Sequence, residues 1–243
     1  MSRVPRIYHP EPLQLGATLE LSDQAAQHVA RVLRMGEGDA LHLFDGQGGE
    51  YQAQIRSCDK RQVTVELLRF DPRESESPLV ITLAQGVSKG DRMDYTLQKA
   101  VELGVSRIVP LDTERSVVNL KGDRREKKMA HWQGVLISAC EQCGRNRVPE
   151  LLPWQGISNW LAKPLSGLGL LLDHRAEQGI HGLPETRELI LLIGPEGGLA
   201  DAEREQAVLR GYQGLRLGPR VLRTETAALT AIAALQSRWG DLA

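Results

Sequence analysis

The sequence predicts an α/β protein, in which a domain built on a parallel sheet follows a small β-rich unit. Beyond residue 78, short and continuously apolar runs alternate with helical patterns, which is typical of a parallel sheet buried on both faces. Before residue 72, short runs of alternating character are separated by turn residues, which indicates short strands. The polar, proline-bracketed stretch 71–78 lies between the two patterns, so we expect domains at residues 1–72 and 73–243.

The composition excludes several classes of protein. A formal net charge of −1 argues against a protein that coats nucleic acid nonspecifically, and an aromatic content of 4% argues against a Phe- and Tyr-rich stacking platform. The three cysteines are too few for a disulfide framework, which indicates a reducing compartment. No apolar run approaches the roughly 20 residues of a membrane span, so we expect a cytoplasmic protein that is neither exported nor membrane-embedded.

In the first unit, Ser22 is a good N-cap for a short amphipathic helix. The helical period places Ala25, Val29 and either Val32 or Leu33 on one face. Three strands follow, separated by turn signals, at residues 41–43, 51–55 and 63–67.

In the second domain, strands and helices alternate. The expected strands are Leu79–Ala84, Ile108–Leu111, Leu168–Leu172, Leu189–Ile193 and Leu215–Leu217. The expected helices are about Asp91–Leu103, about Arg124–Cys143, and one after each of the last two strands. The last helix is small and apolar around much of its circumference over 227–235, so it must be buried closely, and a subunit interface is one means of burying it.

Two loops at the carboxyl ends of strands are the candidate binding site, because ligands bind there in α/β domains. The first is Gly194-Pro195-Glu196-Gly197-Gly198, whose glycines permit positive φ and a close approach of the ligand to the backbone. A tight turn without a ligand is the alternative interpretation. The spacing matches neither the dinucleotide fingerprint nor the phosphate-binding loop, which argues against NAD or ATP bound in those modes.

The second loop, Leu217–Ala227, adds polar side chains. Arg220 and Arg223 bracket two apolar residues, and Thr224 is expected to be the N-cap of the helix that carries Glu225 in its first turn. Helix capping alone explains Thr224 and Glu225, but it does not explain two arginines beside a Gly-Pro turn.

Taken together, an ordered series of motifs over nearly the whole chain resembles the SPOUT superfamily of S-adenosylmethionine-dependent RNA methyltransferases. The resemblance is closest to the bacterial 16S ribosomal RNA uracil-N3 methyltransferase family. The residues that carry it are Arg6–His9, His28–Arg34, Lys89–Asp94, Gln98–Val105, Glu141–Arg145, Gly194–Gly198 and Leu217–Ala227.

The resemblance implies a PUA-like, RNA-binding β-barrel in residues 1–72. It also implies a catalytic domain with a C-terminal trefoil knot in residues 73–243, and a homodimer. The cofactor would be S-adenosylmethionine, and the substrate N3 of a uridine, U1498 in the family, in 16S RNA of the small ribosomal subunit. No periodicity predicts the knot, which breaks the general rule that chains do not thread their own loops.

The resemblance also assigns the cofactor site residue by residue. The residues expected to hold the cofactor are Leu172, Ile193, Gly194, Pro195, Glu196, Gly197, Gly198, Leu217, Gly218, Leu222, Thr224 and Ala227. Apolar and glycine residues suit a cation that has no phosphate. Because the N3 proton must be removed and negative charge develops on the uracil oxygens, we expect Arg223 to stabilise that charge, with Glu225 or Glu196 as the carboxylate that accepts or orients the proton.

Arginines and lysines on both domains are the expected RNA contacts, since arginine suits phosphate groups. They are Arg3, Arg6, Arg31, Arg34, Lys89, Arg92, Arg115, Arg145, Arg147 and Arg220. Charged residues on helices are usually only solvated, which we expect of the cations in 124–128.

One position departs from the family pattern. The family usually has Ser after Gly-Gly-Leu, whereas this chain has Ala200, so Asp201 would cap the next helix one residue later.

Other chemistries are set aside. Cys140 and Cys143 have the spacing of a redox or zinc pair, but no second pair exists and the six histidines are not spaced to share a metal, so we expect no metal. Two alternatives from other classes stay open: a noncatalytic RNA-binding or ribosome-assembly factor, and a nucleotide hydrolase.

Overall fold

The computed structural model describes residues 4–59 and 62–242, and the chain packs into two compact units. The first unit runs to Glu76 and also contains Cys140–Val148, while the second contains Ser77–Ala139 and the chain from Pro149 onward. The sequence pattern gives no sign that 140–148 pack with the N-terminal unit. The predicted RNA contact at Arg3 lies outside the described residues.

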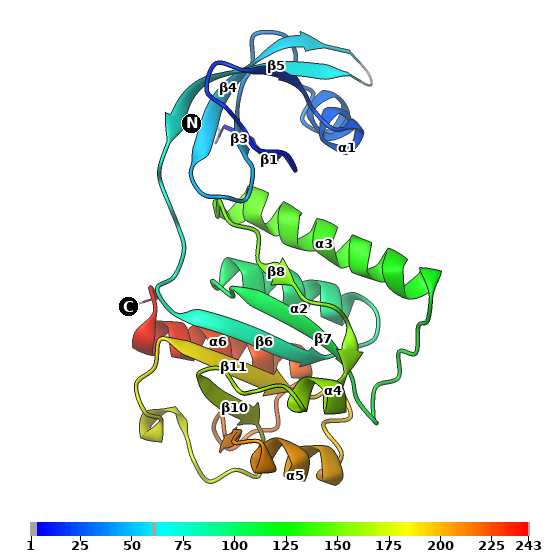
Figure 1. The fold of residues 1–243 in the computed structure, drawn as a ribbon, viewed down its shortest axis with the longest axis vertical. Coiled ribbons are helices and arrows are strands. Elements are labelled where there is room, and N and C mark those ends of the chain that lie inside the picture. The colour runs from blue at the N-terminus through cyan, green and yellow to red at the C-terminus, as the bar shows by residue number, and fades with distance from the viewer. Residues whose placement is uncertain (1–3, 60–61, 243) are drawn as a thin grey trace. The chain divides into compact units, whose positions relative to one another are not determined.

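The first unit is a five-stranded sheet with the strand order β1-β3-β4-β5-β2 (Figure 1). The strands are β1 (Arg6–Tyr8), β2 (Thr18–Glu20), β3 (Ala40–Phe44), β4 (Glu50–Cys58) and β5 (Val63–Asp71). Strand β1 is parallel to β3, and the other pairs are antiparallel. This confirms the small β domain, although no ladder among the described residues joins β1 to β2.

A short helix of the first unit begins as expected and then changes its period. Helix α1 (Asp23–Gln27) has Ser22 as its N-cap, and the Ser22 side chain accepts from the Ala25 N–H. The chain continues as a π-helical turn, η1 (His28–Val32). Because the wider π turn rotates less per residue than an α-helix, the core-facing position falls one residue later: Val32 is 67% exposed and Leu33 packs on the core.

The second unit contains a parallel sheet with the order β12-β10-β11-β6-β7-β8, and β9 also pairs with β7. The strands are β6 (Val80–Gly86), β7 (Arg107–Asp112), β8 (Glu150–Leu151), β9 (Gln155–Gly156), β10 (Leu168–Leu172), β11 (Glu188–Ile193) and β12 (Gln213–Leu215). The strand pairs of this sheet are all parallel among the described residues, and the central strands β6 and β11 are buried along most of their length. The predicted α/β class is therefore confirmed.

Helices flank this sheet. They are α2 (Asp91–Glu102), α3 (Asp123–Cys143), α4 (Ile157–Leu161), α5 (Asp201–Leu209) and α6 (Thr224–Trp239), with a 3₁₀ turn, η2 (Ile180–Gly182). Helices α4 and α5 pack with the apolar cluster that includes Ile190 and Leu192 of β11. Helix α6 packs against α2 and β11, so the apolar C-terminal helix finds much of its burial within the unit (Figure 1). No helix in the described part of the chain is long and apolar enough to cross a membrane.

The strand order brings the candidate loops together. Strands β12, β10, β11 and β6 are neighbours and parallel, so their carboxyl ends lie along one edge of the sheet. The segments that follow β10, β11 and β12, which are far apart in sequence, therefore meet at that edge.

Candidate functional site

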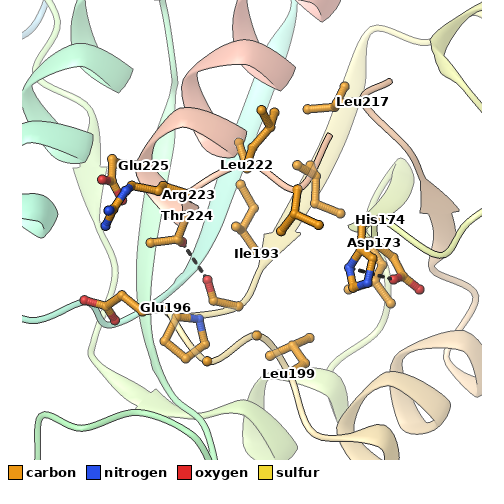
Figure 2. Close-up of a pocket in the computed structure, with 18 of the residues that line it drawn as sticks. Asp173, His174, Ile193, Glu196, Leu199, Leu217, Leu222, Arg223, Thr224 and Glu225 are labelled. Atoms are coloured by element: carbon orange, nitrogen blue, oxygen red, sulfur yellow. Dashed lines mark hydrogen bonds and ion pairs between the residues drawn. The ribbon is translucent and has the colours of Figure 1, made fainter. Parts of the chain in front are cut away.

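A cavity of about 580 Å³ lies at the carboxyl ends of β10, β11 and β12 (Figure 2). Its lining contains every residue expected to hold a cofactor: Leu172, Ile193, Gly194, Pro195, Glu196, Gly197, Gly198, Leu217, Gly218, Leu222, Thr224 and Ala227. Arg223 and Glu225, the other catalytic candidates, line it as well. All of these residues belong to the second unit, so the cavity is complete within one compact body.

The glycine loop folds tightly back on itself. A Cβ on Gly194 would lie 2.8 Å from the carbonyl carbon of Gly198, and Gly198 itself has a φ of +68°. Both positions therefore require glycine. The loop also packs closely on the end of β6, where a Cβ on Gly86 would lie 2.6 Å from the Pro195 ring. These contacts give the first wall of the cavity a fixed backbone.

The Thr224 side chain joins the two candidate loops. Its Oγ1 donates to the Gly194 carbonyl at 2.7 Å and accepts from Gln85 Nε2 at 3.0 Å, and both Thr224 and Gln85 are buried. The N-cap of α6 is Arg223, so the expectation that Thr224 caps the helix is wrong. The hydroxyl binds a carbonyl distant in sequence instead of a helix N–H.

The two candidate carboxylates have different surroundings. Glu196 Oε1 accepts from the Lys89 backbone N–H at 2.9 Å and from Arg92 Nη1 at 3.2 Å. Glu225 Oε2 is buried and has no hydrogen-bond partner in the described structure. Glu225 therefore has a buried oxygen that no protein donor satisfies among the described residues, whereas Glu196 is already bound to the start of α2 and the residue before its N-cap.

Figure 2 shows Arg223, Glu225 and Glu196 on one side of the cavity and Asp173 and His174 on the other. Asp173 pairs with Arg204 and lies 3.6 Å from Arg175 Nε. Burial opposes the ionisation of Asp173, but the Arg175 backbone N–H and the Arg204 guanidinium outweigh it and hold the pKa of Asp173 below its ordinary value.

Sequence reasoning did not select this second group of polar residues. Asp173, His174 and Arg175 directly follow the buried strand β10, so a polar triplet at a strand's carboxyl end was the signal available. Arg204 lies on α5, and no local pattern links it to the cavity.

The predicted RNA contacts fall into two exposed groups. Arg92, Arg115 and Arg220 line the cavity. Four further predicted contacts are exposed but do not line the cavity: Arg31, Arg34, Lys89 and Arg147.

Arg6 and Arg145 are corrections to the predicted RNA contacts, because both are buried by protein. Arg6 is 6% exposed, pairs with Glu50 at 2.7 Å, and donates to the Cys140 carbonyl at 2.6 Å and to the Asn146 side chain. Arg145 is 4% exposed and donates through Nε to Glu76 Oε1 at 3.1 Å. Neither guanidinium is accessible to a phosphate, so both are structural. Two of the surface cations of α3 are more than solvated, because Arg125 pairs with Asp112 at 2.9 Å and Lys128 pairs with Asp94 at 3.1 Å.

The start of helix α5 also differs from expectation. Ala200 is the N-cap and Asp201 is the first helical residue, so the shifted cap at Asp201 is wrong. Asp201 instead pairs with Arg175 at 3.1 Å. The Ala200 N–H donates a hydrogen bond to Oε2 of Glu203, in the first turn of the helix, at 2.9 Å.

The cysteine pair is part of the packing of α3. Cys140 is buried, and burial raises the pKa of its thiol to about 12, which removes thiolate reactivity. Among the residues that the structure describes, no three His, Cys, Asp or Glu side chains are grouped to hold a metal ion.

The sequence matches two family models. The RNA methyltransferase domain matches residues 75–236, and the RNA methyltransferase PUA domain matches residues 21–68. Ribosomal RNA small subunit methyltransferase E of Buchnera aphidicola subsp. Schizaphis graminum is 37% identical over 99% of this chain and 98% of its own length. The protein of the same name from Bacillus subtilis is 29% identical over 93% of this chain and 92% of its own.

Solved structures share the complete fold. A methyltransferase of Legionella pneumophila, in complex with S-adenosylmethionine, superposes with a TM-score of 0.96 at 44% identity and covers 99% of this chain and 100% of its own. Ribosomal RNA small subunit methyltransferase E of Neisseria gonorrhoeae, bound to S-adenosylmethionine, gives 0.93 at 42% identity with the same coverage. These matches confirm the resemblance seen in the motifs, and the chain belongs to the RNA methyltransferase family that includes the ribosomal RNA small subunit methyltransferase E proteins.

Proposed function

We propose that this protein transfers a methyl group from S-adenosylmethionine to N3 of a uridine in 16S RNA of the small ribosomal subunit, U1498 in the family. The observation that carries the proposal is the cavity, which gathers the predicted cofactor residues and both Arg223 and Glu225 around one space. Relatives of the same fold, at more than 40% identity, hold S-adenosylmethionine in their solved structures.

The cavity fits the proposed cofactor. Its volume of about 580 Å³ is in the range of small-molecule sites. Leu172, Leu217 and Leu222 supply apolar surface, and the glycines at 194 and 218 leave the backbone open to close approach.

The reacting groups lie on the Glu225 side of the cavity. We assign Glu225 as the acceptor of the N3 proton, because its buried Oε2 has no other partner in the described structure. Arg223 is exposed and makes no ion pair there, so its guanidinium is free to stabilise the charge that develops on the uracil oxygens. When bound, S-adenosylmethionine supplies a methyl group on a sulfonium sulfur, and the C–S bond breaks as the N3–C bond forms.

Glu196 receives a different role in this proposal. Its carboxylate holds Arg92 and the Lys89 backbone, and it therefore orders the edge of the cavity where RNA would enter. Arg92, Arg115 and Arg220 are the proposed RNA contacts at the cavity, with Lys89, Arg31, Arg34 and Arg147 contributing elsewhere.

The wider assembly follows from the same family membership. We propose an RNA-binding PUA-like domain in residues 1–72 and a catalytic domain with a trefoil knot in residues 73–243. We further propose that the protein acts as a homodimer in the cytoplasm, where its ribosomal substrate is made.

The test incubates the purified protein with labelled S-adenosylmethionine and small subunits that lack the modification, and then maps the methylated base. We expect label at N3 of one uridine. Absence of label in RNA would contradict the proposal. Failure to bind S-adenosylmethionine in calorimetry would favour a noncatalytic RNA-binding or assembly factor, and nucleotide turnover without methyl transfer would favour a hydrolase.

A further inference from the structure

A buried carboxylate behind the glycine loop joins two segments of the second unit. Glu203, in the first turn of α5, is 8% exposed and does not belong to the cavity lining. Its Oε2 accepts from the Ala200 N–H at 2.9 Å, and its Oε1 accepts from the Glu114 N–H at 2.8 Å. The first bond caps the helix, but the second reaches a segment 89 residues away.

The segment that Glu203 holds is a compact turn after β7. The Ser116 N–H donates to the Thr113 carbonyl at 3.0 Å, and Ser116 Oγ accepts from the Thr113 N–H at 3.2 Å. Arg115 lies inside this turn, directly after the N–H that Glu203 binds. The turn therefore fixes the direction in which the Arg115 side chain leaves the backbone.

Arg115 is placed against the glycine loop at the edge of the cavity. Its Nη1 donates to the Gly197 carbonyl at 3.1 Å, and a Cβ on Gly197 would lie 3.1 Å from the Arg115 Cβ. The described residues offer Arg115 no ion-pair partner, whereas Arg92 at the same cavity is paired with Glu196. Arg115 thus presents an exposed, unneutralised guanidinium beside the proposed cofactor.

We propose that Glu203 is a positioning residue for RNA binding: it anchors the 113–116 turn so that Arg115 meets an RNA phosphate at the mouth of the cavity. The inference rests on the proposed function for the nature of the substrate. An ionised carboxylate suits the task because each oxygen accepts one backbone N–H, and charge-assisted bonds are stronger than neutral ones. An amide in its place has one acceptor oxygen and turns an N–H donor toward another N–H.

The test compares Glu203→Gln with Glu205→Gln, which removes the same charge from an exposed position of the same helix. We expect Glu203→Gln to raise the KM for small subunits about tenfold, since a bond to a charged group is lost. The dissociation constant for S-adenosylmethionine should stay within about a factor of two, since Glu203 does not line the cavity. Glu205→Gln should leave both values unchanged.

A double-mutant cycle with Arg115→Ala separates positioning from general loosening. If Glu203 acts through Arg115, Glu203→Gln adds little to the KM in the Arg115→Ala background. An equal increase in both backgrounds would overturn the inference. So would a loss of S-adenosylmethionine affinity that matches the loss of RNA affinity.

Two further measurements keep the inference testable if Glu203→Gln does not fold. Ser116→Ala loosens the same turn from its other side and should raise the RNA KM in the same way. In the wild-type protein, the Glu114 amide should exchange slowly with solvent, and fast exchange would contradict the bond to Glu203. If the wild type transferred no methyl to RNA, the proposed function would fail, while amide exchange and direct RNA binding would still test the role of Glu203.

Discussion

At the scale of single residues, two carboxylates that the sequence does not distinguish have different hydrogen-bond partners in the structure. Glu196 and Glu225 are both carboxylates in loops at the same sheet edge. Glu196 is bound to Arg92 and to a backbone N–H, and Glu225 has a buried oxygen without a partner among the described residues. This difference is the basis of the proposal that Glu196 has a positioning role and Glu225 a proton-accepting role.

We predict that Glu225→Gln lowers kcat for methyl transfer by about 100-fold or more, the usual contribution of a general base. The dissociation constant for S-adenosylmethionine should change little, because the amide keeps the size of the carboxylate. Single-turnover kinetics and calorimetry measure the two quantities. Glu196→Gln is the comparison: its effect should appear mainly in the KM for RNA, and equal losses of kcat in both variants would refute the assignment.

Thr224 carries a second prediction at this scale. Thr224→Val leaves the Gly194 carbonyl without its hydroxyl donor and Gln85 Nε2 without one acceptor, so the free energy of unfolding should fall by about 1–3 kcal/mol. Thr224→Ser keeps the hydroxyl, so in this variant the free energy of unfolding should fall by less. Urea unfolding measures both, and a larger loss for Thr224→Ser than for Thr224→Val would show that the methyl group, not the hydroxyl, stabilises the site.

At the scale of elements, helix α5 begins without a side-chain acceptor on its N-cap. Ala200 has the extended backbone of an N-cap, with φ −65° and ψ 157°, but no hydroxyl. In a capping box, the N-cap side chain and the side chain three residues later each accept from the other residue's backbone N–H. Here the Glu203 side chain accepts from the Ala200 N–H, but Ala200 has no side-chain acceptor for the Glu203 N–H.

We therefore predict that Ala200→Ser raises the free energy of unfolding by about 0.5–1 kcal/mol, because the new hydroxyl can accept from the Glu203 N–H. Ala202→Ser, at the second residue of the same helix, adds a hydroxyl where no cap is needed and should not stabilise the protein. Thermal unfolding compares the variants. A gain of equal size at both positions would contradict capping as the cause.

Most long elements were predictable from the sequence, and the short ones were not. The buried strands β6, β7, β10 and β11 and the helices α2 and α3 lie within a few residues of their expected bounds, because continuous apolar runs and helical periods are strong signals. Strands β1, β2, β8 and β9 have two or three residues, too few to show a period. The hydroxyl of Thr224 was misassigned because its partner lies 30 residues away.

At the scale of the whole molecule, the first unit is assembled from distant parts of the chain. Arg6 of β1 binds Glu50 of β4 and the carbonyl of Cys140 in the last turn of α3. The family motifs contain Arg6 and Arg145, but they do not tell buried guanidinium groups from RNA-binding ones. Burial is a property of the folded unit, so only the structure separates the two.

We predict that Arg6→Met destabilises the first unit by about 3 kcal/mol, because several buried acceptors lose their donor. Affinity for S-adenosylmethionine should persist, since the whole cavity lining belongs to the second unit. Hydrogen exchange resolved along the chain and calorimetry report the two effects. Loss of cofactor binding together with the first unit would show that the two units do not hold their structure separately.

The same cluster predicts a pH dependence. Burial raises the pKa of Glu50, but the hydrogen bond and charge of Arg6 outweigh it, so the pKa lies below its ordinary value of 4.5. A lowered pKa contributes stability above the unfolded value, which is lost as the pH falls through the folded value. The difference in unfolding free energy between wild type and Glu50→Gln should thus be constant near neutral pH and shrink below 4.5. A difference that grew in acid would contradict this sign.

The three walls of the cavity come from the last third of the chain, around residues 172–175, 193–199 and 217–227. Synthesis from the N-terminus delivers the first unit's strands early and the third wall last. A nascent or prematurely terminated chain that stops between Val148 and Arg223 therefore carries the complete first unit but lacks part or all of the third wall of the cavity. Such fragments are potential competitors for the ribosomal substrate, because they retain proposed RNA contacts at Arg31 and Arg34 without the means to modify it.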